Sequence, residues 1–189
     1  MRGLLTEQEL GDLLDQARAE LFRLEVLDSY DVATDGGDFA RYVAGEQGPD
    51  MARKGPWLDR LRQDAARGLH NSRVHVVRSP LSDYLRYEME WGYAPNAAAG
   101  EDIRILDLAE VSEPTGLTEH DFWLVDDHQA VVMHYDDAGH FEGASLAPGA
   151  ELGRYQHAAR AAWQAAVPFS RYWAAHPQCQ QRAQAGRQR

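Results

Sequence analysis

The sequence predicts an α/β protein, or one of the related α+β class, with a mixed sheet of about six strands and helices on both faces. Three observations support this prediction. Helical patterns alternate with strand patterns over residues 6–107, which is typical of parallel strands joined by helices. Three closely spaced strand patterns over residues 121–145 then predict an antiparallel meander. A long helical pattern follows the meander and is expected to close the fold.

The amino-terminal third is expected to hold one strand between helices. Thr6 and Glu9 form a capping-box pattern, so a helix is predicted to begin there. The strand that follows alternates apolar and charged side chains, which predicts that one of its faces is exposed to solvent. Pro56 is expected in the first turn of a further helix. In chain order, the predicted elements are a helix at 6–19, a half-buried strand at 21–30, a turn at 31–38, a short helix at 39–44, a loop at 46–55 and a helix at 56–67.

Residues 79–104 form the densest run of aromatic, charged and turn residues in the chain. A helix is predicted to begin at Pro80, with Ser82 as a candidate cap, and to end near Gly92. A loop over residues 93–100 then leads to the next strand. The strands on either side of this run are predicted at 72–78 and 101–107.

The carboxy-terminal part contains the meander and its covering helix. Asp-rich turns separate the three strands. Pro168 is expected to kink the long helix or to start a new segment. One globular domain is therefore predicted over residues 1–176, with a polar tail at 177–189 that is expected to be either flexible or a weak helix. Its parts are the helix at 6–19, an α/β core at 56–146 that ends in strands at 121–126, 130–135 and 139–145, and a helix at 151–173.

Charge and composition narrow the classes of function. The chain has 189 residues and a formal net charge of −11, which disfavours direct nucleic-acid binding through phosphate contacts. No secretory leader or membrane span is recognised, so a cytoplasmic location without membrane contact is expected. Cys179 is the one cysteine, which excludes an internal disulfide. Lys54 is the one lysine, so any mechanism that needs a lysine must use it.

Histidines and aspartates gather in the meander. A two-histidine, one-carboxylate site is conceivable among them, but Asp-rich turns with solvated histidines explain the same residues, and we favour that interpretation. No metal or cofactor is therefore expected. An alternative hypothesis is an enzyme that uses His120, Asp127 and His134 for acid/base or phosphoryl-type chemistry. The histidines concerned are His120, His128, His134 and His140.

The central run favours recognition over catalysis. Tyr84, Tyr87 and Trp91 are spaced by three and four residues, so they line either a concave binding surface or a helix stripe packed into the core. The charged residues after Gly100 are not explained by core packing and are expected to pair with Arg78 or Arg86. The candidate binding residues are Tyr84, Arg86, Tyr87, Trp91, Tyr93, Asn96, Glu101, Asp102 and Arg104.

Residues 56–145 resemble one half of a phospholipase-D-type domain, on the segments R-G-L-H-N-S-R-V-H-V-V-R, A-G-E-D-I-R-I and H-D-F-W-L-V-D-D. Those domains carry a histidine nucleophile, a lysine two residues later and an aspartate five residues after the lysine. At that spacing this chain has His120, Phe122 and Asp127, so the phosphate-binding cation is missing. The resemblance implies a catalytically silent copy of the fold. The alternative is a chance strand that ends in an aspartate.

Four segments together resemble an actinobacterial family of uncharacterised domains commonly encoded beside helix-turn-helix regulators. They are S-P-L-S-D-Y-L-R-Y-E, W-G-Y-A-P-N-A-A-A-G-E-D-I-R, D-F-W-L-V-D-D and M-H-Y-D-D-A-G-H-F-E-G-A. The resemblance covers residues 20–173 and implies a regulatory neighbourhood. We therefore expect a non-enzymatic regulatory or interaction protein that binds a helix-turn-helix regulator, a peptide or a small molecule.

Overall fold

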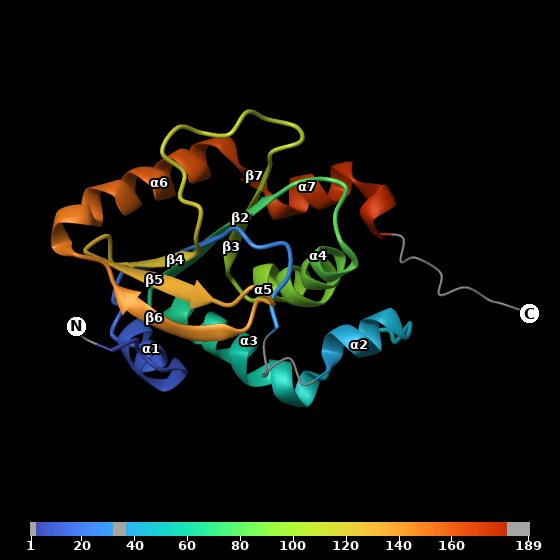
Figure 1. Ribbon diagram of the computed structural model, residues 1–189. Coiled ribbons are helices and arrows are strands. Elements are labelled where there is room, and N and C mark those ends of the chain that lie inside the picture. Colours follow the sequence, from blue (N-terminus) through green and yellow to red (C-terminus); the bar gives the residue numbers. More distant parts are fainter. Residues whose placement is uncertain (1–2, 32–36, 181–189) are drawn as a thin grey trace, which may run out of the picture.

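A seven-stranded mixed sheet forms the centre of the computed structural model, which describes residues 3–31 and 37–180 (Figure 1). The strand order is β6-β5-β4-β1-β2-β3-β7. Strands β1, β2 and β3 are parallel, and the other neighbouring pairs are antiparallel. The predicted mixed sheet with its meander is confirmed. The strands are β1 (Glu20–Glu25), β2 (His70–Val77), β3 (Asp102–Asp107), β4 (Phe122–Val125), β5 (Gln129–Tyr135), β6 (Phe141–Leu146) and the two-residue β7 (Val167–Pro168).

Helices cover both faces of the sheet, as predicted (Figure 1). Helix α6 lies along one face, where its alanines pack on the apolar side chains of β1, β2 and β4. Helices α1 and α3 lie against the other face, and α7 packs beside β3. The helices are α1 (Glu7–Leu14), α2 (Asp38–Val43), α3 (Met51–Ala66), α4 (Asp83–Tyr87), the π-helix η2 (Glu88–Tyr93), α5 (Ala94–Ala98), α6 (Leu152–Ala165) and α7 (Phe169–Ala175), with short 3₁₀ turns at Gly149–Glu151 and Pro177–Gln180.

Strand β1 is buried on both sides, so its prediction as a half-buried strand over residues 21–30 was wrong in burial and length. Phe22 and Leu24 face α6, as the alternation predicts. On the other side, the Glu25 side chain is only 2% exposed. The alternation of charged and apolar residues therefore reflects two buried faces of β1, one in an apolar environment and the other in an ionic one.

The central helical segment is longer than predicted. It does not end near Gly92, because α4 continues through the π-helical turn of η2 into α5, and the predicted loop over residues 93–100 is largely helical. A π-turn widens the helix and shifts the faces of the residues that follow it. Met89 and Tyr93 consequently join the core beside α7, whereas Trp91 faces α2. The predicted cap is confirmed, because the Ser82 hydroxyl accepts the backbone N–H of Leu85.

Other helix boundaries also differ from the predictions. The capping box at Thr6 is confirmed, but α1 ends at Leu14. Helix α3 begins at Met51, because the Asp50 side chain caps it, so Pro56 lies inside the helix and not in its first turn. Pro168 separates α6 from α7, which confirms that a new segment starts there.

The first residues of the predicted tail are helical, which is one of its two expected forms, and they pack on the domain. Residues 177–180 form a 3₁₀ turn, and Cys179 is buried in the core beside α7. The remainder of the predicted tail, residues 181–189, and most of the predicted turn at 31–38 lie outside the described residues.

Asp126 ties the β4–β5 turn to the start of β1. Its carboxylate accepts the backbone N–H groups of Ala19 at 2.8 Å and Glu20 at 3.0 Å, and also that of Arg18. These hydrogen bonds hold the pKa of the Asp126 carboxyl below its usual value. We expect Asp126→Ala to lower the free energy of unfolding by about 1–3 kcal/mol, because hydrogen bonds to a charged acceptor are lost.

Asp127→Ala is the matched control for this prediction. Asp127 also has a positive φ, 57° against 51° for Asp126, so the backbone cost of alanine is similar in both variants. Urea unfolding of the two variants measures the difference. Equal losses would show that the contacts of Asp126 with β1 do not stabilise the fold.

Candidate functional site

A cavity of about 530 Å³ opens where the central helical segment meets β1, β2, α2 and α3. Its walls are aromatic, and its floor is a group of buried charged side chains on β1 and β2. The size is within the range of small-molecule sites, which span about 300–1,000 Å³. The aromatic residues that line it are Tyr30, Trp57, Tyr84, Tyr87, Trp91 and Tyr93.

The aromatic stripe of the central segment is both core and cavity wall. Tyr84, Tyr87 and Trp91 are 7%, 8% and 3% exposed. Their rings pack edge to face, with centroids 5.7 Å apart for Tyr84 and Tyr87 and 5.9 Å apart for Tyr87 and Trp91. Phe39 and Tyr42 of α2 pack on the same rings. The two interpretations of the stripe are therefore compatible, because the rings contact α2 and also line the cavity.

Arg73 of β2 is the centre of the charged floor. Its guanidinium lies 2.7 Å from Glu25 and 2.8 Å from Glu101. Asn96 donates its Nδ2 hydrogen to the same Glu101 carboxylate at 2.8 Å. The Tyr93 ring lies against the guanidinium, 5.3 Å from its carbon. One buried arginine thus fixes two carboxylates, and the Glu101 carboxylate in turn holds the Asn96 amide.

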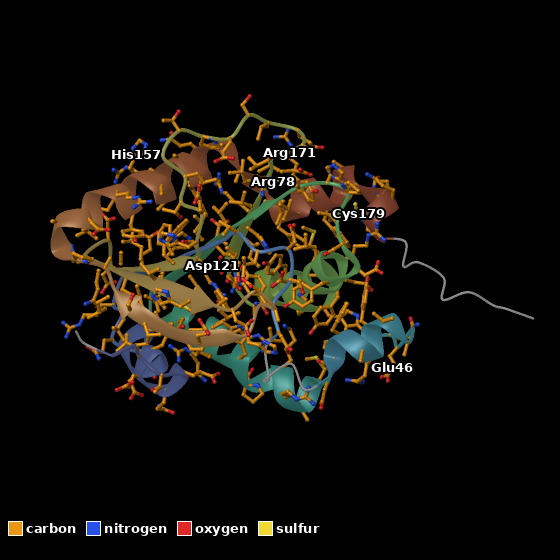
Figure 2. The ribbon with its side chains drawn as sticks, in the orientation of Figure 1. Glu46, Arg78, Asp121, His157, Arg171 and Cys179 are labelled. Atoms are coloured by element: carbon orange, nitrogen blue, oxygen red, sulfur yellow. The ribbon has the colours of Figure 1, made fainter. Side chains whose placement is uncertain are left out.

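Arg23 extends the ionic group towards the meander. Its guanidinium lies 2.8 Å from Glu25 and 3.8 Å from Asp121. Asp121 is 1% exposed and lies in the interior of the fold (Figure 2). It accepts the Tyr30 hydroxyl at 2.8 Å and the Val26 backbone N–H at 2.8 Å. These bonds connect the floor of the cavity with the start of β4.

The Tyr93 hydroxyl lies between two acceptors, His75 and Glu25. His75 Nε2 lies 2.9 Å from the Leu27 carbonyl, which can only accept, so this nitrogen carries the proton. Burial lowers the pKa of His75, so the ring is neutral and Nδ1 has a free lone pair. The Tyr93 hydroxyl lies 2.6 Å from this Nδ1 and 2.9 Å from Glu25. Its proton therefore serves two acceptors.

Burial and ion pairing set the protonation of the floor. Burial alone would raise the pKa of Glu25, but Arg23 and Arg73 outweigh it and lower that pKa to about 2. Burial raises the pKa of Asp121, which Arg23 only partly offsets. Burial beside Glu25 also raises the pKa of the Tyr93 hydroxyl well above its ordinary value. Glu25 is thus held as a carboxylate and Tyr93 as a neutral phenol.

The described residues hold one group with metal-ligand spacing, formed by Glu25, His75 and Glu88. One ligand atom from each lies within 4.8 Å of the others. However, Arg23 and Arg73 already contact both oxygens of Glu25 at 2.8 and 2.7 Å. A divalent cation would be repelled by two guanidiniums at that distance. We therefore interpret the group as part of the ionic floor.

Two polar atoms on the cavity lining are buried and have no hydrogen-bond partner among the residues that the structure describes. They are the Asn96 Oδ1 acceptor and the Arg23 Nε donor. A buried polar atom that makes no hydrogen bond costs about 1–3 kcal/mol. Such atoms at the wall of a cavity are natural contacts for a ligand.

The structure places the predicted binding residues in two groups. Five of them line the cavity, and Glu101 lies directly behind it on Arg73. The expected pairing of the 101–104 charges with Arg78 or Arg86 was wrong, because Glu101 pairs with Arg73 instead. Arg78 contacts Glu113. The five residues that line the cavity are Tyr84, Tyr87, Trp91, Tyr93 and Asn96.

Three predicted residues lie away from the cavity. Arg86 pairs with Asp83 on the surface of α4. Asp102 lies 3.6 Å from His70. The Arg104 guanidinium lies 3.9 Å above the Trp163 ring, on the α6 face of the sheet. Strand alternation explains this last result, because Arg104 points opposite to its neighbours Ile103 and Ile105.

The charged floor itself was not among the predicted features. Arg23 pairs in register with Arg73, and Glu25 with His75, on adjacent parallel strands. Both strands carry polar side chains at alternate positions, which is the available signal. In the first strand this alternation predicts a solvent-exposed face, because the segments that cover it are remote in sequence.

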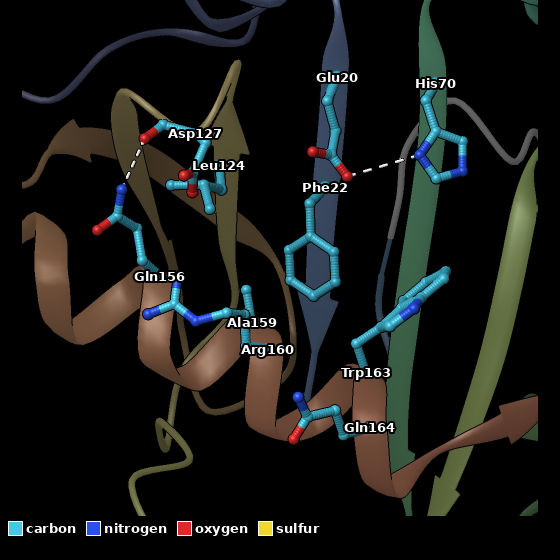
Figure 3. A pocket seen from close by; sticks show the side chains of 10 residues that line it. All are labelled: Glu20, Phe22, His70, Leu124, Asp127, Gln156, Ala159, Arg160, Trp163 and Gln164. Atoms are coloured by element: carbon cyan, nitrogen blue, oxygen red, sulfur yellow. Dashed lines mark hydrogen bonds and ion pairs between the residues drawn. The ribbon is translucent and has the colours of Figure 1, made fainter.

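The residues of the alternative enzyme hypothesis do not converge. His120 and His134 line a second cavity of about 600 Å³ beside the β5–β6 turn. Asp127 lies at the other end of β4 and lines a third cavity, of about 230 Å³, where its backbone carbonyl accepts Gln156 of α6 (Figure 3). Phe122, at the lysine position of the phospholipase-D pattern, is fully buried against Tyr155. It contacts no solvent through which a phosphate could reach it.

These features define an α/β protein with an open mixed sheet and an aromatic cavity above buried ion pairs. The family described as "Domain of unknown function (DUF6879)" matches residues 8–174, and the chain belongs to this family. No match was found among curated proteins. Within residues 3–31 and 37–180, no helix combines the length and apolarity that a membrane crossing requires.

Proposed function

We propose that this protein is a non-enzymatic regulatory protein that binds a small molecule in the cavity above Arg73. The observation that carries the proposal is the combination of aromatic walls, a buried polar floor and a volume of about 530 Å³. Ligand sites typically combine apolar walls with a few fixed polar groups that orient the ligand. Here the groups are fixed by ion pairs of 2.7–2.8 Å between buried or partly buried side chains.

The protonation of the floor favours recognition over catalysis. An acid/base catalyst works best when its pKa is near the working pH. The pKa of Glu25 is lowered to about 2, and that of Tyr93 is raised well above its ordinary value. Neither group exchanges a proton readily near neutral pH. The arrangement is suited to holding hydrogen bonds in fixed directions.

We further propose that ligand binding is coupled to a partner regulator of the helix-turn-helix type in an actinobacterial setting. The net charge of −11 suits a partner with a basic surface. On this proposal, the phospholipase-D-like features are remnants of a fold that has lost its catalytic cation. Co-purification of the chain with a regulator encoded beside it would support this second proposal.

Thermal-shift screening of the wild-type protein with a chemically diverse small-molecule library tests the proposed function. We expect at least one compound to raise Tm, because a ligand at 100 times its Kd adds about 2.7 kcal/mol to the stability. Trp57→Ala should reduce the shift, since Trp57 lines the cavity and is 37% exposed, so that its loss costs little stability.

Met51→Ala is the matched control. Met51 is another exposed apolar residue on α3, at 55%, and it does not line the cavity. We expect its ligand response to equal that of the wild type. A library without a stabilising compound, or equal responses in the two variants, would contradict binding in this cavity.

A further inference from the structure

The geometry points to a nucleotide-like ligand: a flat nucleobase-type ring in the cavity, joined to an anionic group at its mouth. This inference rests on the proposed function and names the ligand class. Three regions of the cavity carry it: the polar floor, the aromatic walls and the cationic mouth.

The floor excludes an anionic group. Glu25 and Glu88 both line the cavity, and Glu101 lies behind Asn96. Both Glu25 oxygens are already held by the terminal nitrogens of Arg23 and Arg73. A carboxylate or phosphate at this depth would be repelled by the glutamates at low dielectric. The inner end of the ligand is therefore neutral.

The two unpaired atoms show which polar groups the neutral part of the ligand should carry. Asn96 is 5% exposed, and its Oδ1 needs a hydrogen-bond donor. Arg23 Nε needs an acceptor. A nucleobase offers several donors and acceptors around its planar ring, and asparagine and arginine are typical partners of base edges. An apolar ligand would leave both atoms unsatisfied.

The walls favour a flat ring. Tyr87, Trp91 and Tyr93 all line the cavity and are each less than 9% exposed, so their rings are held by packing. Contacts between a base and aromatic side chains stabilise binding whatever the base, because every base has a π face. Rigid rings gain this contact with little loss of side-chain entropy on binding.

The mouth carries the cations that match an acidic group. Arg53 and Lys54 of α3 line the cavity, Arg53 exposed and Lys54 half-buried. Arg53 also pairs with Asp50 at 3.1 Å, and Asp38 on the same lining is held by Arg41 at 2.6 Å. Lys54 is the one lysine of the chain, against eighteen arginines. Lysine and arginine are the usual partners of phosphate oxygens. A ligand with its base on the floor therefore directs its phosphate towards α3.

Calorimetric titration and thermal shift with AMP, GMP, CMP and UMP test the inference, with the four nucleosides and ribose 5-phosphate as comparisons. We expect at least one nucleoside monophosphate to bind and to raise Tm. Its nucleoside should bind about tenfold or more weakly. Lys54→Gln should weaken the nucleotide about tenfold and leave the nucleoside unchanged. Arg62→Gln, on the exposed side of the same helix, is the control and should change neither.

Three results would overturn the inference. One is the absence of binding of all four monophosphates at millimolar concentration. Another is equal affinity for nucleotide and nucleoside. The last is binding of ribose 5-phosphate as tight as that of the nucleotides, which would indicate a phosphate contact alone. If other library compounds stabilise the protein through Trp57 while nucleotides do not, the inference fails and the proposed function stands. If no compound does, both fail.

Discussion

Arg73→Met is expected to lower the free energy of unfolding by about 3–5 kcal/mol, because removal of one partner from a buried ion pair leaves uncompensated charge. The Arg73 side chain is 8% exposed and contacts Glu25 and Glu101, whose side chains are 2% and 4% exposed. Methionine preserves much of the volume, so the loss isolates the charge. For a chain of this size, Tm should fall by about 6–20 °C. Chemical and thermal unfolding measure both quantities.

Arg62→Met is the matched control. Arg62 also forms an arginine–carboxylate pair, with Asp59 at 2.7 Å, but the two side chains are 57% and 66% exposed. Its loss should cost less than about 1 kcal/mol. The double variant Arg73→Met, Glu101→Gln should recover part of the stability, since it removes one of the two stranded carboxylates. Similar losses for Arg73→Met and Arg62→Met would contradict the role of the buried group.

The sheet was predictable because the apolar side chains that each strand buries are spaced in a regular pattern within that strand's own short segment of sequence. The β4–β6 meander needs only two short turns, one of which lies at Asp126 and Asp127. Both turns can be recognised in the sequence. The charged face of β1 was not predictable in the same way. Its cover comes from Tyr93, Glu101 and other residues more than sixty positions away, and no local pattern records such contacts.

The candidate site was predictable only where one helix supplies several residues. The spacing of Tyr84, Tyr87 and Trp91 places them on one wall, and the structure has them there. Arg104 was grouped with them by sequence proximity, yet strand alternation turns it to the α6 face. The π-turn of η2 was also unpredicted, although it brings Tyr93 to His75.

Acidification is expected to destabilise the protein in two stages, because two floor groups have lowered pKa values. His75 is buried as a neutral ring, whereas the unfolded chain binds a proton below pH 6.5, so stability falls as the pH drops through that value. The pKa of Glu25 falls from 4.5 to about 2 on folding. Its stabilisation is complete above pH 4.5 and is lost towards pH 2, by about 3 kcal/mol in total.

Unfolding free energies measured between pH 7.5 and pH 3 for the wild type, His75→Gln and Glu25→Gln separate these stages from the other titrating groups. His140 and His176 have raised pKa values and act in the opposite sense, but they are common to all three proteins. We expect His75→Gln to lose less stability than the wild type between pH 7.5 and pH 5.5. Glu25→Gln should be less stable at pH 7 and should lose less between pH 5 and pH 3, so that its curve approaches that of the wild type. Parallel curves for all three proteins would show that the protons of the floor are not linked to folding.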